Sequence, residues 1–338
     1  MGYGSYKASD WTKLKNSRGI SSSSGAGEIF SNNQFKEKYD PRFISVRESR
    51  DSEDSPNSTP IILAFDVTGS MGYLAAEIAK NSLNKTALEL YEKRPVSDPH
   101  LMCAAITSPD AQSGLQVTQF EADIRIVEQL LELKVGFGGN LYSFDSMVWY
   151  FAAEHTSIDS YEKRGKKGFL FTIGDEVCGV DRGERLTARE IKEVYNDDVD
   201  HDFSLAELYR MASEKYEIFH IVAKRESSMK TWERFISGRV AYVSEANAQY
   251  LSEVITSIMQ ITNGMNKSDA VAQWSEDARP VVQTAVSTID PSKPFIYSGP
   301  KPVEAPKPQP VEAPKPQPVQ AQPKKESKLK AFLSKLFE

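Results

Sequence analysis

Three oxygen-bearing side chains alternate along one short turn: Asp66, Thr68 and Ser70. The turn directly follows five apolar residues, 61–65, a run typical of a strand buried on both faces of a parallel sheet. The last residue of such a strand lies at the carboxyl edge of the sheet, where ligands bind in open α/β folds. One carboxylate and two hydroxyls are ligands that hard divalent cations, Mg²⁺ above all, prefer. The spacing therefore predicts a cation site at this edge.

A second stretch has the same pattern. Residues 168–173 form a short apolar run that ends in Gly174, Asp175 and Glu176. From residue 61 to about residue 262, strand-like segments alternate with segments of helical periodicity. Such alternation predicts an α/β fold with right-handed crossovers, a doubly wound, mostly parallel, Rossmann-like sheet of about six strands. We expect strands at 61–65, 101–106, 115–120, 168–173, 218–223 and 240–243, and helices at 73–91, 123–133, 144–155, 188–195, 205–215, 229–237 and 246–262.

The segment FDVTGSMG, residues 65–72, resembles the metal-ion-dependent adhesion site (MIDAS) of von Willebrand factor A (vWA) domains, whose signature is DxSxS or DxTxS after the first strand. Two later segments, Gly-Gly-Asn at 138–140 and Gly-Asp at 174–175, stand where that family supplies its other ligands. The resemblance covers residues 61 to about 262 and is strongest to intracellular bacterial and phage members. It implies a vWA fold and a Mg²⁺ site, with Mn²⁺ or Ca²⁺ as alternative ions, whose ligands are Asp66, Thr68, Ser70, Asn140 and Asp175.

Asn140 departs from the family pattern, in which a threonine is usual at this place. Its amide oxygen replaces a hydroxyl, and Thr107 and Ser143 are the alternative ligands. In a site of this kind two carboxylates neutralise the ion, while the neutral oxygens leave it electrophilic toward a further anion. The resemblance thus implies an open coordination position for an Asp or Glu of a partner protein. Glu176 is expected beside the ion without binding it, and Asp110 and Asp145 are expected to be solvated.

No nucleophile–base pair accompanies the site in the three loops that would form it. This favours a non-enzymatic, metal-dependent protein-interaction module or adaptor, and the resemblance adds an AAA+ ATPase as an expected partner. One alternative is a Mg²⁺-dependent, phosphatase-like hydrolase with Asp66 as nucleophile, although Thr68 stands where haloacid-dehalogenase enzymes carry their general acid. Another is a membrane-surface or phage structural protein.

Composition narrows the remaining possibilities. The formal net charge is −6, and no basic face is evident, so nucleic acid is not expected as a partner. Residues 1–7 lack the apolar core of a signal peptide, and no apolar run reaches the length of a membrane span, so a cytoplasmic location is expected. Cys103 and Cys178 belong to no CxxC pair and are expected to be reduced.

The composition changes sharply near both ends of the chain. Repeats of PVEAPKPQ predict an extended, semi-rigid polyproline II linker. The last residues, KLKAFLSKLFE, have the spacing of a basic amphipathic helix that binds a protein groove or a membrane surface. We therefore expect an N-terminal arm that is partly disordered (1–58), a vWA domain (59–265), a partly packed extension (266–299), the Pro-rich linker (300–326) and the amphipathic helix (327–338).

Overall fold

The computed structural model describes residues 6–21, 23–30, 34–109, 114–135 and 143–297. By its contacts the chain divides into two units, residues 1–300 and 301–338, and the second unit lies outside the described residues. The expected linker and terminal helix therefore remain predictions. Among the described residues, no helix is long and apolar enough to cross a membrane.

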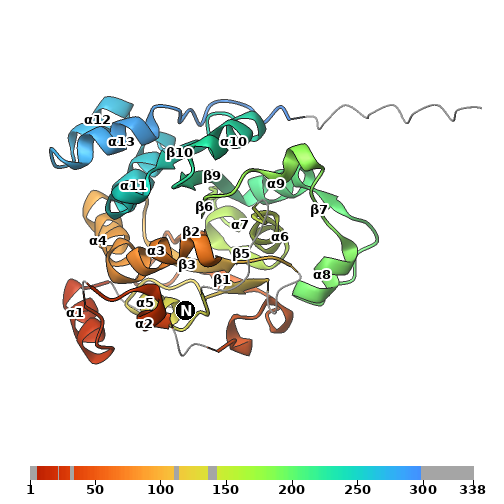
Figure 1. Ribbon diagram of the computed structural model, residues 1–338, viewed down its shortest axis with the longest axis horizontal. Coiled ribbons are helices and arrows are strands. Elements are labelled where there is room, and N and C mark those ends of the chain that lie inside the picture. Colours follow the sequence, from red (N-terminus) through yellow and green to blue (C-terminus); the bar gives the residue numbers. More distant parts are fainter. Residues whose placement is uncertain (1–5, 22, 31–33, 110–113, 136–142, 298–338) are drawn as a thin grey trace, which may run out of the picture. The chain divides into compact units, whose positions relative to one another are not determined.

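Six strands form the central sheet in the order β10-β9-β6-β2-β3-β4 (Figure 1). Neighbouring strands are parallel, apart from the antiparallel pair β3 and β4 at one edge. The connection between those two strands is too short for a parallel crossover, which needs about a dozen residues or more. The strands are β2 Thr59–Asp66, β3 Pro99–Ile106, β4 Leu115–Val117, β6 Gly168–Gly174, β9 Tyr216–Ala223 and β10 Val240–Val243. The predicted α/β fold with a mostly parallel, Rossmann-like sheet of six strands is confirmed.

Helices cover both faces of this sheet (Figure 1). Alternate residues of β2 enter different hydrophobic clusters, Leu63 with one helical layer and Ile62 with the other, as the two-residue period of a strand requires. One layer contains α3 Gly72–Glu77, α4 Leu83–Lys93, α5 Arg125–Leu130 and α11 Leu251–Thr262. The other contains α6 Ser146–Glu154, α8 Ala188–Tyr195, α9 Leu205–Lys215 and α10 Met229–Phe235. The short helix α7, Asp159–Glu162, follows β5.

The helix after β2 is interrupted. We predicted one helix over 73–91, whereas the structure has α3, a π-helical turn at Ile78–Ser82, and then α4. A π turn inserts an extra residue into a helix and is often found near functional sites. Sequence periodicity did not indicate it, because buried residues continue on both sides of the turn.

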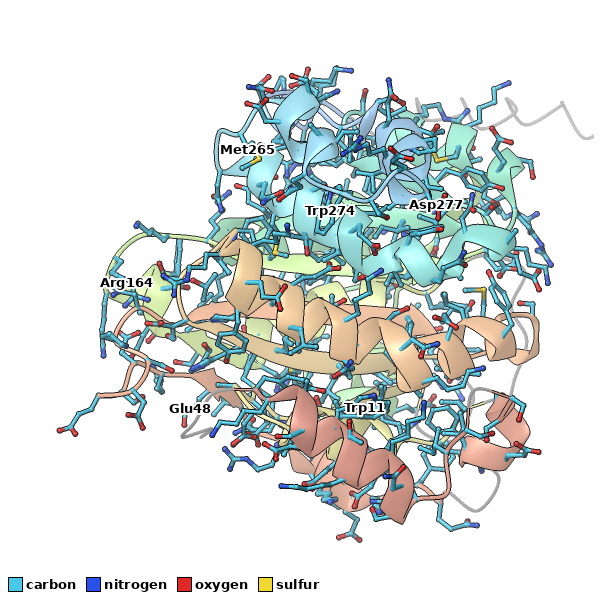
Figure 2. All side chains as sticks on the ribbon, turned by 90° about the vertical axis from the view of Figure 1, so that its left-hand side faces the viewer. Trp11, Glu48, Arg164, Met265, Trp274 and Asp277 are labelled. Carbon is cyan, nitrogen blue, oxygen red and sulfur yellow. The ribbon has the colours of Figure 1, made fainter. Side chains whose placement is uncertain are left out.

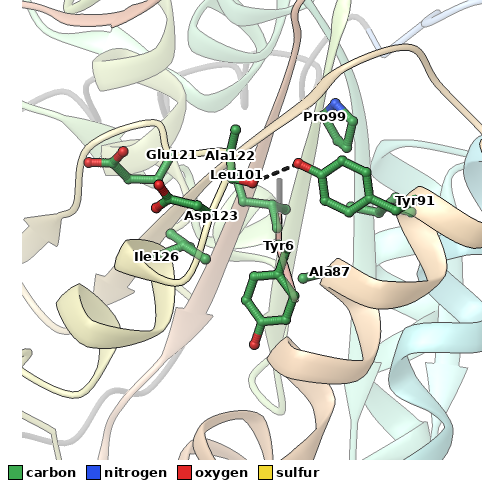
Figure 3. A pocket seen from close by; sticks show the side chains of 10 residues that line it. Tyr6, Ala87, Tyr91, Pro99, Leu101, Glu121, Ala122, Asp123 and Ile126 are labelled. Atoms are coloured by element: carbon green, nitrogen blue, oxygen red, sulfur yellow. Dashed lines mark hydrogen bonds between the residues drawn. The ribbon is translucent and has the colours of Figure 1, made fainter. Parts of the chain in front are cut away.

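The N-terminal arm packs on the domain from residues early in the chain. It forms α1 Ala8–Ser17 and α2 Ala26–Phe30, and Trp11 is buried in the same hydrophobic cluster as α4. Tyr6 inserts between α4 and the segment before α5, in the small pocket of Figure 3, and its hydroxyl donates to Asn84 Oδ1 at 2.9 Å.

The residues after α11 also form helices, α12 Lys267–Ala272 and α13 Ala278–Val286. Trp274 between them is buried, and its Nε1 donates to Ser257 Oγ of α11 at 2.8 Å. Figure 2 looks onto this helical layer and shows Trp274 and Trp11 on opposite sides of α4. Two small sheets complete the fold: β1 Arg47–Ser49 with β5 Thr156–Ile158, and β7 Arg185–Leu186 with β8 Phe203–Ser204.

Helix α9 begins with a capping box that offers a local stability test. Ser204 Oγ accepts the Glu207 backbone N–H, and the Glu207 side chain accepts the Ser204 N–H at 2.8 Å. Because both bonds satisfy otherwise unpaired donors, Ser204→Ala is expected to lower the free energy of unfolding by about 1 kcal/mol. Urea denaturation measures this, with Ser213→Ala of the same helix as control; equal stability of the two variants would contradict the prediction.

Candidate metal site

The sheet brings the two acidic strand ends together. Strands β2 and β6 are parallel neighbours, and their register pairs Phe65 with Ile173. Asp66 and Gly174 follow on these two residues, and a Cβ added at Gly174 would lie 3.6 Å from the Cβ of Asp66. Asp175 follows Gly174, so Asp66 and Asp175 meet at the carboxyl edge of the sheet, as the sequence pattern predicts.

The two predicted hydroxyl ligands lie between these carboxylates. Asp66 Oδ1 accepts the Thr68 backbone N–H at 2.7 Å, which shapes the turn. Thr68 Oγ1 lies 3.5 Å from Ser70 Oγ, and Ser70 Oγ donates to Asp175 Oδ1 at 3.2 Å. Four of the five predicted ligands thus form one connected cluster of oxygens. The fifth, Asn140, lies outside the described residues.

Both carboxylates are buried, Asp175 completely and Asp66 to all but 6%. Burial raises the pKa of Asp66 to about 6; the Thr68 N–H opposes this rise, and the negative charges of Asp175 and Asp145 add to it. Oδ2 of Asp175 is buried and accepts no hydrogen bond within the described residues. The Arg225 guanidinium lies 3.3 Å from this oxygen and partly offsets its charge. Two buried carboxylates side by side still suit a hard cation, because the ion would offset the desolvation of both groups.

Arg225 is the residue of this site that sequence reasoning missed. Its Nε lies 3.3 Å from Asp175 Oδ2, and its Nη1 lies 2.8 Å from Glu176 Oε1. The available signal was its place directly after β9, the strand next to β6. An arginine is not a metal ligand, so a search for oxygen ligands passes over it.

The two alternative ligands, Thr107 and Ser143, make hydrogen bonds to backbone carbonyls. Thr107 is buried, and its hydroxyl donates to the Gly114 carbonyl at 3.2 Å. Ser143 donates its backbone N–H to the Val177 carbonyl at 3.1 Å, which places it beside the loop that contains Asp175. Thr107 lies at the same edge, because it follows Ile106, the register partner of Asp66.

The expectation that Asp145 is solvated was wrong. Its side chain is buried, and Oδ2 lies 2.9 Å from Nδ1 of His220, a fully buried histidine of β9. Packing of α6 against the sheet buries this helix-end carboxylate, and a distant histidine supplies a partner that the local sequence does not reveal. Asp110 lies outside the described residues. Glu176 is partly buried and pairs with Arg225.

The backbone of the loop that contains Asp175 accepts hydrogen bonds from two side chains of the segment after β9. Ser228 Oγ donates to the Asp175 carbonyl at 2.8 Å, and Trp232 Nε1 donates to the Glu176 carbonyl at 3.1 Å. The Trp232 ring stacks on the imidazole of His220 with centroids 3.7 Å apart. These contacts fix the backbone that presents the Asp175 carboxylate.

Among the described residues, the candidate site included, no group of three or more His, Cys, Asp or Glu side chains is placed to hold a metal; the candidate site combines two carboxylates with two hydroxyls. Cys103 and Cys178 are buried free thiols. A groove of about 1270 Å³ lies at the opposite edge of the sheet, where Thr59, Pro99 and Phe169 begin or follow the starts of their strands. It is lined by both acidic and basic residues and contains none of the predicted ligands.

Comparisons with known proteins add little to this geometry. No protein-family model matches the sequence, and a search of curated proteins also found no match. Among solved structures, the pilus adhesin SpaC from Lactobacillus rhamnosus GG in its open conformation is similar with a TM-score of 0.44 and 11% identity, over 64% of this chain and 31% of that chain. Another form of SpaC is similar with a TM-score of 0.38 and 12% identity, over 64% of this chain and 32% of that chain. The aligned part spans about a third of the adhesin's length, and likeness of this degree carries no argument.

Proposed function

We propose that this chain is a vWA-type protein-interaction module that binds a partner carboxylate through a divalent cation and is not an enzyme. The single observation that carries the proposal is the meeting of Asp66, Thr68, Ser70 and Asp175 at one sheet edge. The oxygen types and the burial of both carboxylates support Mg²⁺, or alternatively Mn²⁺ or Ca²⁺.

In this proposal the protein supplies Asp66, Thr68, Ser70, Asp175 and Asn140 to the ion. When bound, the ion supplies an electrophilic position that an Asp or Glu of a partner can occupy. The two carboxylates would neutralise the charge of the ion, and the Thr68 N–H orients the Asp66 carboxylate. Because such a site needs only to bind, we propose an adaptor role. The proposed location is the cytoplasm, and an AAA+ ATPase is one proposed partner. The amphipathic segment 327–338 would be a second docking element that raises avidity.

A cation-dependent co-purification tests this function. The tagged full chain is expected to retain its partner in Mg²⁺ and to lose it in chelator, and Asp66→Ala is expected to lose it in both. Asp123→Ala is a matched control, because Asp123 pairs with Arg125 at the start of α5, away from the site. A partner held equally well in chelator would contradict the proposal, and hydrolysis of a phosphate ester that depends on Mg²⁺ and Asp66 would favour the hydrolase instead.

A further inference from the structure

The guanidinium of Arg225 covers the candidate site from the solvent side. Its side chain is 48% exposed, whereas that of Asp175 is fully buried. One nitrogen, Nε, faces Asp175 Oδ2 at 3.3 Å, and another, Nη1, is paired with Glu176 Oε1 at 2.8 Å. Arg225 therefore has two acidic partners, of which only Asp175 is a proposed ligand of the cation.

The backbone holds Arg225 in this place by a tight turn. The Arg225 N–H donates to the Ala223 carbonyl, only two residues back, at 2.7 Å. The central residue, Lys224, has φ +66°, a left-handed conformation that is uncommon for a residue with a side chain. Strain of this kind persists only where the surroundings enforce it and often accompanies function. Here the turn follows the end of β9, and the Arg225 side chain reaches Asp175 at the end of the neighbouring strand β6.

A divalent cation at Oδ2 of Asp175 would repel the guanidinium, because two positive groups would lie close together in a buried setting where repulsion is weakly screened. Cation binding would therefore weaken the ion pair of Arg225 with Asp175. The pair with Glu176 can persist, since that carboxylate lies farther toward solvent.

We propose that Arg225 competes with the cation for Asp175, so that cation binding turns the guanidinium away from Asp175 while it keeps Glu176. The released donors would then be free to bind the partner carboxylate that the ion also binds. Arg225 is thus a positioning residue that makes carboxylate recognition depend on the cation. This inference rests on the proposed function.

Calorimetric titration of the full chain with Mn²⁺, after dialysis against chelator, tests the competition. Arg225→Gln is expected to bind Mn²⁺ at least about fivefold more tightly than the wild type, the lower end of typical coupling between exclusive occupants. Lys230→Gln, at an exposed lysine of α10, is the matched control, because it removes the same charge and Lys230 lies outside the turn that positions Arg225. Its affinity is expected to stay at the wild-type value. The Mn²⁺ affinity of Arg225→Lys should lie between those of the wild type and Arg225→Gln, because lysine keeps the charge and lacks the planar guanidinium.

A second readout follows the guanidinium itself. In the wild type, the side-chain Nε–Hε NMR signal of Arg225 should shift on addition of Mg²⁺, and the signal of Arg239, which is paired with Glu217, should not. Equal Mn²⁺ affinities of folded Arg225→Gln and Lys230→Gln, with no shift of the Arg225 signal, would overturn the inference while the cation site stands. Absence of Mn²⁺ binding in the wild type and in all variants would refute the proposed function and this inference with it.

Discussion

Replacement of Asp175 by asparagine is expected to raise the Kd for Mg²⁺ at least about 100-fold while the fold is kept, because one of two ligand charges is removed. The asparagine Oδ1 can still accept the Ser70 hydroxyl, and the Ser228 bond to the backbone carbonyl is unaffected. The change therefore removes charge with little change of shape. Isothermal titration of the purified full chain with Mg²⁺ measures the effect.

The control for this variant is Asp123→Asn, which removes one carboxylate charge at the start of α5, where Asp123 pairs with Arg125. It should bind Mg²⁺ as the wild type does. Circular dichroism establishes that both variants are folded. If folded Asp175→Asn binds Mg²⁺ with unchanged affinity, Asp175 is not a ligand and the proposed set of ligands is wrong.

Glu89→Gln is expected to stabilise the protein at alkaline pH. Glu89 of α4 is 7% exposed, and it faces α11, where Thr256 Oγ1 donates to it at 3.4 Å. Burial raises the pKa of Glu89 to about 8, and the charge of Glu253 adds to the rise, while Lys85, which pairs with Glu253, opposes it. The ionised form is thus disfavoured in the folded protein relative to the unfolded chain.

The direction with pH follows from this difference. The folded pKa lies above the unfolded value, so the wild type loses stability as the pH rises from about 4.5 to about 8, where Glu89 ionises first in the unfolded chain. Glutamine does not ionise. The gain of Glu89→Gln in unfolding free energy should therefore be near zero at pH 4.5 and reach up to about 5 kcal/mol above pH 8, at about 1.4 kcal/mol per pKa unit.

Urea denaturation at pH 5, 7 and 9 measures this gain. The exposed Glu92 of the same helix provides the control variant Glu92→Gln, whose stability relative to the wild type should not depend on pH in this way. A loss of stability in Glu89→Gln at pH 9 would mean that the ionised carboxylate is favoured by its partners, Lys85 above all.

The central strands could be predicted because parallel strands that are covered on both faces are continuous apolar runs. The pairs β1 with β5 and β7 with β8 could not, since strands of two or three residues such as Arg47–Ser49 carry no period. The N-terminal arm is polar on average, and its packing depends on a few large residues such as Trp11, whose contacts with α4 are distant in sequence.

The site was predictable to the extent that it is local. Asp66, Thr68 and Ser70 occupy one turn, and Asp175 ends a strand of the same kind, so pattern and topology place them together. Long-range contacts were not predictable. The pair of Asp145 with His220 joins residues of α6 and β9, and Arg225 reaches Asp175 across two strand ends. Such contacts follow from the packing of side chains, and a single sequence does not specify them.

The most direct test of the account is a crystal structure of the full chain grown or soaked with Mn²⁺, in which anomalous scattering locates the ion. We expect an anomalous peak bounded by oxygens of Ser70, Thr68 and Asp175, at coordination distance from the nearest of them, with the guanidinium of Arg225 turned away from Asp175. An ordered site with Arg225 still on Asp175 and no peak at saturating Mn²⁺ would contradict it.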